Sequence, residues 1–286
     1  MGELSGERSG SRKSLKRLAR REVAALSLAG LVVLLATAAA LAVTGALTQP
    51  AGTAGCASET GTGPCADGHG LRYADSVAVS ADGKSVYAAS DLSRAVVRFT
   101  RNTTTGAISQ PAGTAGCISE TGAGLCVDGH GLNQPLSVAV SADGKSVYAA
   151  SPVSDAVARL DRNTTTGAIT QPAGTAGCVS ETGAGPCADG HGLDNPTSVA
   201  VSADGKSVYV ASHYGSAVAR FNRNTTTGGI TQPVGTAGCV SETGAEPCAN
   251  GHGLLIPNSV AVSPDGKSVY STSGYSKSVV RFNRAP

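Results

Sequence analysis

The sequence predicts an all-β protein made of four equivalent four-stranded units behind one N-terminal apolar helix, and three observations carry this prediction. The first cysteines of four pairs fall at 56, 117, 178 and 239, a period of 61 residues. Each period contains short segments of alternating apolar and polar residues separated by turn residues. The first 44 residues differ, because they are basic and then continuously apolar. A fixed period of this kind indicates stacked copies of one unit rather than unrelated domains.

The strands of one unit can be placed from alternation and turn signals. Asp82-Gly83 is the dipeptide of a tight hairpin, and an Asn-Thr-Thr-Thr-Gly loop forms a second turn at 102–106. Four short antiparallel strands with tight turns make one blade of a β-propeller. In the first unit we expect them at 76–80, 85–90, 95–99 and 107–110. Residues 111–136 then hold a cysteine pair and lead to the next first strand.

The ends of the repeat array predict how the ring closes. Residues 46–49 match fourth strands such as 168–171, whereas residues 278–284 match third strands. We therefore expect residues 46–50 to pair beside residues 278–282, which would remove two open sheet edges at once. The prediction is a closed β-propeller of four blades over 45–286. Two chains forming an eight-bladed ring is the alternative, so a homodimer stays open.

The first 44 residues, which we call the leader, predict the cellular compartment. Residues 1–22 form a basic region with seven Lys and Arg, and an uncharged run follows from Val23 to Val43. A basic start before such a run is an export signal, and 21 residues are also enough to span a bilayer as a helix. Residues 23–44 are therefore either a cleaved signal peptide or a membrane anchor. The remainder is extracytoplasmic, secreted or held at the membrane by residues 23–43.

The cysteines agree with an oxidising compartment. All eight follow the leader, and eight residues separate the members of each pair, a spacing that is wrong for zinc. We predict four disulfides within units, each closing a short loop. The pairs are Cys56–Cys65, Cys117–Cys126, Cys178–Cys187 and Cys239–Cys248.

The strand and turn residues also carry a family resemblance. Residues 263–270, Ser-Pro-Asp-Gly-Lys-Ser-Val-Tyr, follow Ser-Val-Ala-Val at 259–262, and this pattern resembles the YVTN-type, lactonase-like β-propeller repeat. The resemblance covers residues 45–286 and implies the propeller fold, with a lactonase-like hydrolase as the activity it suggests. This chain departs from the family pattern in two features. The family has seven blades whereas this chain has four units, and the family pattern lacks the cysteine-bearing insertion of this chain.

Differences between the copies predict where ligands bind. Two loops vary among the four units, one before the first strand and one between the second and third strands, and both lie at the same end of a blade. Loops on a rigid scaffold usually carry function, although relaxed drift in solvent-exposed loops is the alternative. The predicted binding residues are Arg72, Tyr73, Asp75, Asp91, Arg94, Asn133, Gln134, Asp155, Asp194, Asn195, His213, Tyr214, Tyr275 and Lys277.

Catalytic and metal-binding candidates are few. A hydrolase needs an acid, a base and a cation placed asymmetrically, for which His213, Asp155 and Arg94 are the candidates. His69, His130, His191 and His252 recur once per unit and could hold a metal if they surrounded the channel mouth. We favour a glycine-flanked turn in which each histidine bonds the cysteine loop. No motif indicates a cofactor.

The net charge of the chain after the leader excludes one class of binding partner. The residues after the leader carry a net charge of −2, which excludes a nucleic-acid binder held by phosphate contacts. The sequence favours an extracytoplasmic, non-catalytic propeller that binds an unknown protein or small molecule. The alternative is a lactonase-like hydrolase. A membrane contact is expected only through an uncleaved leader.

Overall fold

The structure is a computed structural model that describes residues 45–245 and 247–285. The chain divides after Gln49, and the unit from Pro50 onward contains every strand that the structure describes. The expected leader helix lies outside the described residues. Within the described ranges, no helix is long and apolar enough to cross a membrane.

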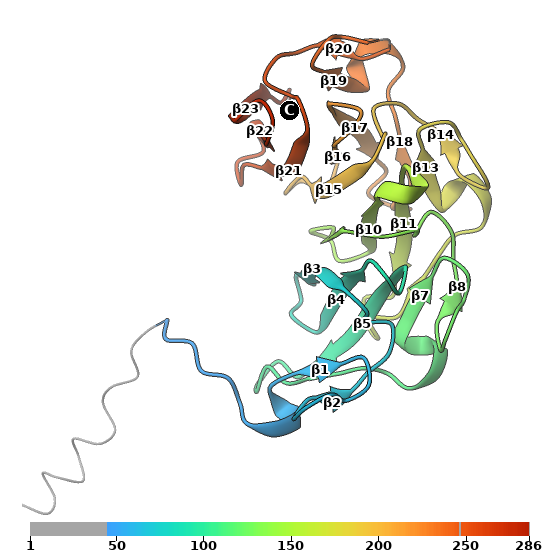
Figure 1. Ribbon diagram of the computed structural model, residues 1–286, viewed down its shortest axis with the longest axis vertical. Helices are drawn as coiled ribbons and strands as arrows, with labels where there is room; N and C mark the ends of the chain where they lie inside the picture. The colour runs from blue at the N-terminus through green and yellow to red at the C-terminus, as the bar shows by residue number, and fades with distance from the viewer. Residues whose placement is uncertain (1–44, 246, 286) are drawn as a thin grey trace, which may run out of the picture. The chain divides into compact units, whose positions relative to one another are not determined.

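Four sheets follow one another along an arc in the unit from Pro50 onward (Figure 1). Blade 1 contains β3 (Ala74–Val79), β4 (Ser85–Ser90), β5 (Ala95–Arg101), β6 (Ile108–Ser109), β7 (Cys117–Ser119) and β8 (Val127–Asp128). Blade 2 contains β9 (Ser137–Val140), β10 (Ser146–Ser151), β11 (Ala156–Arg162), β12 (Ile169–Thr170), β13 (Cys178–Ser180) and β14 (Ala188–Asp189). Blade 3 contains β15 (Pro196–Val201), β16 (Ser207–Ser212), β17 (Ala217–Arg223), β18 (Ile230–Thr231), β19 (Cys239–Ser241) and β20 (Ala249–Asn250).

The two ends of the arc carry smaller sheets. Blade 4 consists of β21 (Pro257–Val262), β22 (Ser268–Ser273) and β23 (Ser278–Asn283). At the other end, β1 (Ala57–Ser58) and β2 (Ala66–Asp67) form a separate two-stranded parallel sheet. Short 3₁₀ helices occupy Gly52–Ala54, Gly113–Gly116, Pro152–Ser154, Gly174–Ala176 and Gly235–Ala237.

The predicted Asp-Gly hairpin is confirmed between β3 and β4. Gly83 adopts φ +67°, a conformation that glycine accepts without steric cost. Asp82 Oδ1 accepts hydrogen bonds from Ser80 Oγ at 2.5 Å and from Lys84 N at 3.0 Å. The side chain therefore holds the turn, and the register of β3 against β4 follows from it.

The outer strand of a blade differs from the prediction. Residues 107–110 form only the two-residue β6, which pairs with Thr100 and Arg101. After a 3₁₀ turn the cysteine segment returns as β7 and pairs with Ala95–Val97 on the same edge of β5, and β8 lies parallel to it. The insertion therefore belongs to the sheet. The prediction failed because a three-residue strand is too short to show alternation.

All four predicted disulfides are present. Each joins residues nine apart in the sequence, with Cα atoms 4.7 Å apart. The bond from Cys117 to Cys126 links β7 to the end of the loop that leads into β8. These bonds indicate an oxidising, extracytoplasmic environment.

The core lies between blades. The cluster between blades 2 and 3 contains Tyr148 and Val157 from one sheet, and Val199 and Phe221 from the next. The innermost strands β3, β9, β15 and β21 are in contact in that order. Each junction thus buries a face of one blade against a face of the next, and only blades 2 and 3 are covered on both faces by blades of the described residues.

A polar cluster recurs beside each of these apolar junctions. Arg162 donates from Nε to Tyr87 Oη at 2.8 Å, and its Nη2 lies 3.0 Å from Asp82 Oδ2. Tyr87 Oη in turn donates to Gly167 O at 2.6 Å. We call such an Asp, Tyr and Arg set a junction triad. The next two triads are Asp143, Tyr148 and Arg223, and Asp204, Tyr209 and Arg284.

The expected closure by residues 46–50 is wrong for this structure. Residues 45–50 form no strand, and among the described residues β23 pairs with β22 alone. The end strands β3 and β21 are not among the packed strand pairs of the described residues. The physical reason is curvature, because blades that follow the gentle turn of the arc do not bring its two ends together after four sheets.

Candidate functional site

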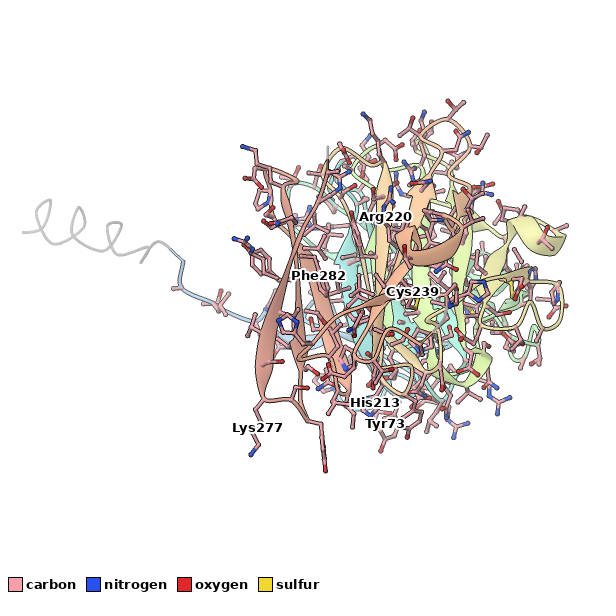
Figure 2. The ribbon with its side chains drawn as sticks, turned by 90° about the horizontal axis from the view of Figure 1, so that it is seen from above. Tyr73, His213, Arg220, Cys239, Lys277 and Phe282 are labelled. Atoms are coloured by element: carbon pink, nitrogen blue, oxygen red, sulfur yellow. A yellow bond between two sulfur atoms is a disulfide. The ribbon has the colours of Figure 1, made fainter. Side chains whose placement is uncertain are left out.

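The variable loops of each blade lie against one another at one end of the strands, as the sequence predicted. Asp91 N donates to Tyr73 O at 2.8 Å in blade 1, and His213 N donates to Asn195 O at 2.9 Å in blade 3. Figure 2 shows Tyr73, His213 and Lys277 at this end and Arg220 toward the opposite end. We call this end the variable-loop face. Thirteen of the fourteen predicted binding residues belong to its loops, and Asp75 is the second residue of β3.

Two non-glycine residues per blade adopt positive φ on this face. The same two repeat positions do so in every blade, whatever side chain they carry, so the fold imposes the conformation. One position lies where the inner strand begins and its register shifts. The residues are Tyr73, Gln134, Asn195 and Ile256 at the first position, and Arg94, Asp155, Ser216 and Lys277 at the second.

Blade 1 combines two carboxylates with an arginine. Burial raises the pKa of Asp91 above its ordinary value, the nearby Asp75 raises it further, and Arg94 opposes the rise. Asp91 Oδ1 is buried without a hydrogen-bond partner. We call Arg72, Asp75, Asp91 and Arg94 the blade-1 corner. A carboxyl with a raised pKa beside a cation is the arrangement that acid–base catalysis uses.

A cavity of about 230 Å³ adjoins the blade-1 corner. Arg72, Leu92 and Ser93 contribute from the variable loops, and Glu59 and His69 contribute from the preceding segment. Arg72 N is held by Ser93 Oγ at 2.9 Å, which links the two loops at the cavity wall. The cavity therefore meets the corner at Arg72, and Glu59 adds a carboxylate to its wall.

A second acidic corner lies between blades 2 and 3. Asp155 Oδ1 accepts a hydrogen bond from Asn195 N at 2.8 Å, which joins the two blades. Burial raises the pKa of Asp194, and the charge of Asp155 adds to the rise. The ring of His213 lies 4.8 Å from that of Tyr214, edge to face. His213 and Asp155 therefore belong to this corner, whereas the third catalytic candidate, Arg94, belongs to the blade-1 corner.

The four repeated histidines do not surround a channel mouth. Gln110 clamps the His69 backbone: Oε1 accepts from His69 N and Nε2 donates to His69 O, both at 2.8 Å. His69 packs over Gly116, where an added Cβ would lie 2.8 Å from His69 Nε2. The next residue, Gly70, lies against the Cys117–Cys126 sulfurs. The expected bond from histidine to the cysteine loop is replaced by the glutamine clamp.

The same holds at the next two copies. Gln171 and Gln232 clamp His130 and His191 in the same way. Across the described residues, no group of three or more His, Cys, Asp or Glu is placed to hold a metal ion. The alternative in which the four histidines hold one metal therefore has no support in the described residues, because His69, His130 and His191 are each clamped at a different glutamine.

Sequence reasoning missed two polar sets. Glu120 Oε2 accepts a hydrogen bond from Leu132 N at 2.5 Å, and Glu59, Glu181 and Glu242 do the same in their units. Burial raises the pKa of Glu120 and of Glu181. The junction triads are the second set. Both sets recur every 61 residues as identical polar residues, which was the available signal.

The fold and the variable-loop face define a class, a β-propeller whose loops at one end of the blades carry the differences between units. A family model described as lactonase, 7-bladed β-propeller, matches residues 52–242. The chain belongs to this lactonase propeller family. The family's seven blades exceed the four blades in the described residues.

Solved structures of similar fold include three lactonase propellers. A candidate 6-phosphogluconolactonase from Bacteroides uniformis has a TM-score of 0.50 at 17% identity, covering 74% of this chain and 50% of its own. A candidate 6-phosphogluconolactonase from Bacteroides fragilis has a TM-score of 0.50 at 18% identity, covering 78% and 56%. The periplasmic gluconolactonase of Pseudomonas aeruginosa has a TM-score of 0.50 at 15% identity, covering 79% and 57%.

At these identities the likeness shows the fold alone. The chain spans about half the length of each of these neighbours. No curated protein matches the sequence.

Proposed function

We propose that this chain is a lactonase-like hydrolase whose reaction takes place at the blade-1 corner. The observation that carries the proposal is the pair of carboxylates beside an arginine, next to the cavity of about 230 Å³. Family membership supports the reaction class. This reverses the preference for a non-catalytic module that the sequence alone suggested.

The corner offers the groups that hydrolysis of a cyclic ester needs. Asp91, with Asp75 beside it, accepts a proton from water as the water oxygen attacks the acyl carbon. Arg94 or Arg72 stabilises the negative charge on the carbonyl oxygen. The bond from the acyl carbon to the ring oxygen then breaks, and the proton passes to that oxygen. The product is a hydroxy acid.

The repeat supplies matched controls for a test. Lys277 occupies in blade 4 the position that Arg94 occupies in blade 1, and His213 occupies in blade 3 the position of Asp91. The full chain is screened for hydrolysis of five- and six-membered lactones. We expect Asp91→Asn and Arg94→Gln to lower kcat/KM by about 10²–10⁴-fold. Lys277→Gln and His213→Ala should leave it unchanged.

Two results would contradict the assignment. Loss of activity in His213→Ala with full activity in Asp91→Asn would move the site to the corner between blades 2 and 3. Absence of turnover with every lactone in the screen would remove the hydrolase function.

A recognition surface is the second candidate, and a specific observation favours it. Tyr73, Tyr214 and Tyr275 stand on the variable-loop face with relative exposures of 70%, 68% and 73%. Exposed tyrosines are enriched where proteins bind partners. Affinity capture with the wild-type chain and with a variant carrying alanine at all three positions tests this function. Partners retained by wild type and lost by the variant would support it, and equal capture would not.

A further inference from the structure

Valines that are buried between neighbouring blades have exposed equivalents at the two ends of the arc. Val138, Val199 and Val260 are each 6% exposed, whereas their blade-1 equivalent Val77 is 67% exposed. Val79, two residues along β3, is 54% exposed. The face of blade 1 that corresponds to a covered face in the other three blades is therefore bare.

Blade 4 shows the reciprocal exposure. Val96 and Val157 are 0% exposed and Val218 is 5% exposed, whereas their equivalent Val279 is 73% exposed. Tyr270 is 39% exposed, whereas Tyr87 is fully buried. Blade 4 thus lacks cover on the face that every other blade packs against its successor. The two bare faces are the two halves of one repeating blade–blade interface.

The junction triad is divided in the same way. Arg101 of blade 1 is equivalent to Arg162, but the hydrogen bond described for its side chain goes only to Gly83 O, at 3.0 Å, and no described carboxylate pairs with it. Asp265 of blade 4 is equivalent to Asp82, but it bonds only Ser263 Oγ and Lys267 N. One end of the arc therefore carries the cation, and the other carries the carboxylate and the tyrosine.

The strand edges are complementary as well. β5 pairs with β6 and β7, whereas the equivalent edge of β23 has no partner among the described residues. β1 is equivalent to part of β7, yet it pairs only with β2. By the register of blade 1, Ser58 belongs opposite Ser278, as Ser119 lies opposite Ala95. β1 and β2 are thus the outer strands that blade 4 lacks.

Cavities mark the places that these strands would fill. One of about 370 Å³ lies along β23 and is lined by Val240, His252 and Val280 among others. One of about 320 Å³ is lined by Tyr209, Val240 and Phe282. Their equivalents in blades 1 and 2, which are Tyr87, Ile118 and Leu160, enclose Ile169. The repeat makes Leu47 the counterpart of Ile169, and Leu47 is 99% exposed.

We propose that these two faces form an interface between two copies of this chain. Blade 4 of one copy packs between blade 1 and the β1–β2 sheet of the other, with Arg101 of one copy on Asp265 and Tyr270 of the other. Two identical junctions then close a ring of eight blades.

The curvature of the arc favours ring closure by a second copy over ring closure within one chain. Four blades close a ring only if each turns by about 90°, whereas seven- and eight-bladed rings need about 51° and 45°. The arc covers 50–57% of lactonase propellers, as four blades of seven would. The arc therefore turns less at each blade than a four-bladed ring requires (Figure 1), and two such arcs supply eight blades. The interface also continues the packing already present between neighbouring blades.

The blade-4 face is more polar than its equivalents. Thr272, which lies opposite Val279 in the sheet, replaces the alanine found at 89, 150 and 211. A face that water contacts in the free chain carries more polar groups than a permanent core. This composition fits an interface that forms between separately folded copies.

A charge exchange tests the proposal. The full chain, with its disulfides formed, is examined by analytical ultracentrifugation as wild type, as Arg101→Asp and as Asp265→Arg. Wild type should sediment with twice the chain mass. Each single variant places like charges at both junctions and should sediment with the mass of one chain. Mixing the two variants pairs opposite charges at both junctions and should restore the doubled mass.

Controls separate loss of the interface from loss of folding. Lys267→Glu changes an exposed charge on the Asp265 hairpin and should leave the doubled mass intact. Val77→Asp places a charge on the bare face of blade 1 and should give single chains whose circular dichroism matches wild type. Wild type that sediments as one copy would overturn the proposal. Single variants that keep twice the chain mass would also overturn it. So would a mixture of the two variants that keeps the mass of one chain.

Discussion

Arg162 Nη2 lies 3.0 Å from Asp82 Oδ2, although 80 residues separate the two in the sequence. The Arg162 side chain is 1% exposed, and it also bonds Tyr87, Ser85 and Gly144. One side chain therefore joins the end of β11 to the hairpin of the preceding blade. Its burial makes the blade junction depend on these bonds as well as on apolar contact.

We expect Arg162→Ala to lower the free energy of unfolding by about 2–4 kcal/mol, because it leaves several buried polar groups without partners. Denaturant unfolding followed by circular dichroism measures the change. Lys145→Ala alters an exposed side chain of blade 2 and should stay within about 0.5 kcal/mol of wild type. Equal effects of the two substitutions would contradict a structural role for the triad.

Acid should weaken the junctions. Partial burial works to raise the pKa of Asp82, but the hydrogen bonds from Ser80 and Lys84 and the pairing with Arg162 outweigh it and lower the pKa to about 2. Asp204 behaves likewise, with Ser202 and Arg284 lowering its pKa to about 2. The unfolded carboxyl titrates near about 3.9.

A carboxyl with a lowered folded-state pKa contributes stability that is present above its unfolded pKa and is lost as the pH falls through its folded pKa. The free energy of unfolding should therefore decline between about pH 4 and pH 2. Unfolding curves taken across this window measure the decline. In a variant with Asp82→Asn and Asp204→Asn the decline should be shallower, and an unchanged slope would exclude these two groups as its source.

The disulfides should contribute unequally. Cys117 and Cys126 are buried in a core cluster with Val97 and Phe99, whereas Cys56 and Cys65 are half-buried. Replacing Cys117 and Cys126 by serine should cost about 2–4 kcal/mol from loop closure, together with the burial of two hydroxyls. The same change at Cys56 and Cys65 should cost less. Thermal unfolding of the two variants compares them, and a larger loss at the second pair would refute the ordering.

The proposed hydrolase predicts a pH effect at the blade-1 corner. Burial, and then the charge of Asp75, hold the pKa of Asp91 above its ordinary value. Asp75→Asn removes the like charge, so the pKa of Asp91 should fall. If Asp91 is the base, the acidic limb of the kcat/KM profile moves to lower pH. Asp155→Asn, a matched change at the other acidic corner, should leave the profile where it is.

Local sequence was sufficient for the three inner strands of a blade and for the turns. The Asp82-Gly83 hairpin and the Asn102 turn lie where alternation and turn residues placed them, because these features depend on neighbours in the chain. The four disulfides followed from regular spacing. The corners on the variable-loop face were predictable only as a list of loop residues. Which of them meet, such as Asp155 with Asn195, depends on how one blade packs on the next.

The fourth strand shows a limit of a different kind. Its place beside β5 is shared by β6 and β7, which are separated by seven residues along the chain. Pairing between short segments is decided by which edge is free in space, and alternation does not record that. The alternative of a histidine ring was open for the same reason, because the path of each segment depends on the distant glutamine that clamps its histidine backbone.

By itself the sequence determined the repeat, its period, the three inner strands of each blade and the cysteine pairs. Each of these depends on residues close together in the chain or on exact recurrence. Only the tertiary structure decided which surfaces of identical blades are covered. Val77 and Val138 occupy the same position in the repeat, yet one is 67% exposed and the other 6%. The reason is that burial depends on the neighbouring blade, and the curvature of the arc, rather than the local sequence, determines whether that neighbour is present.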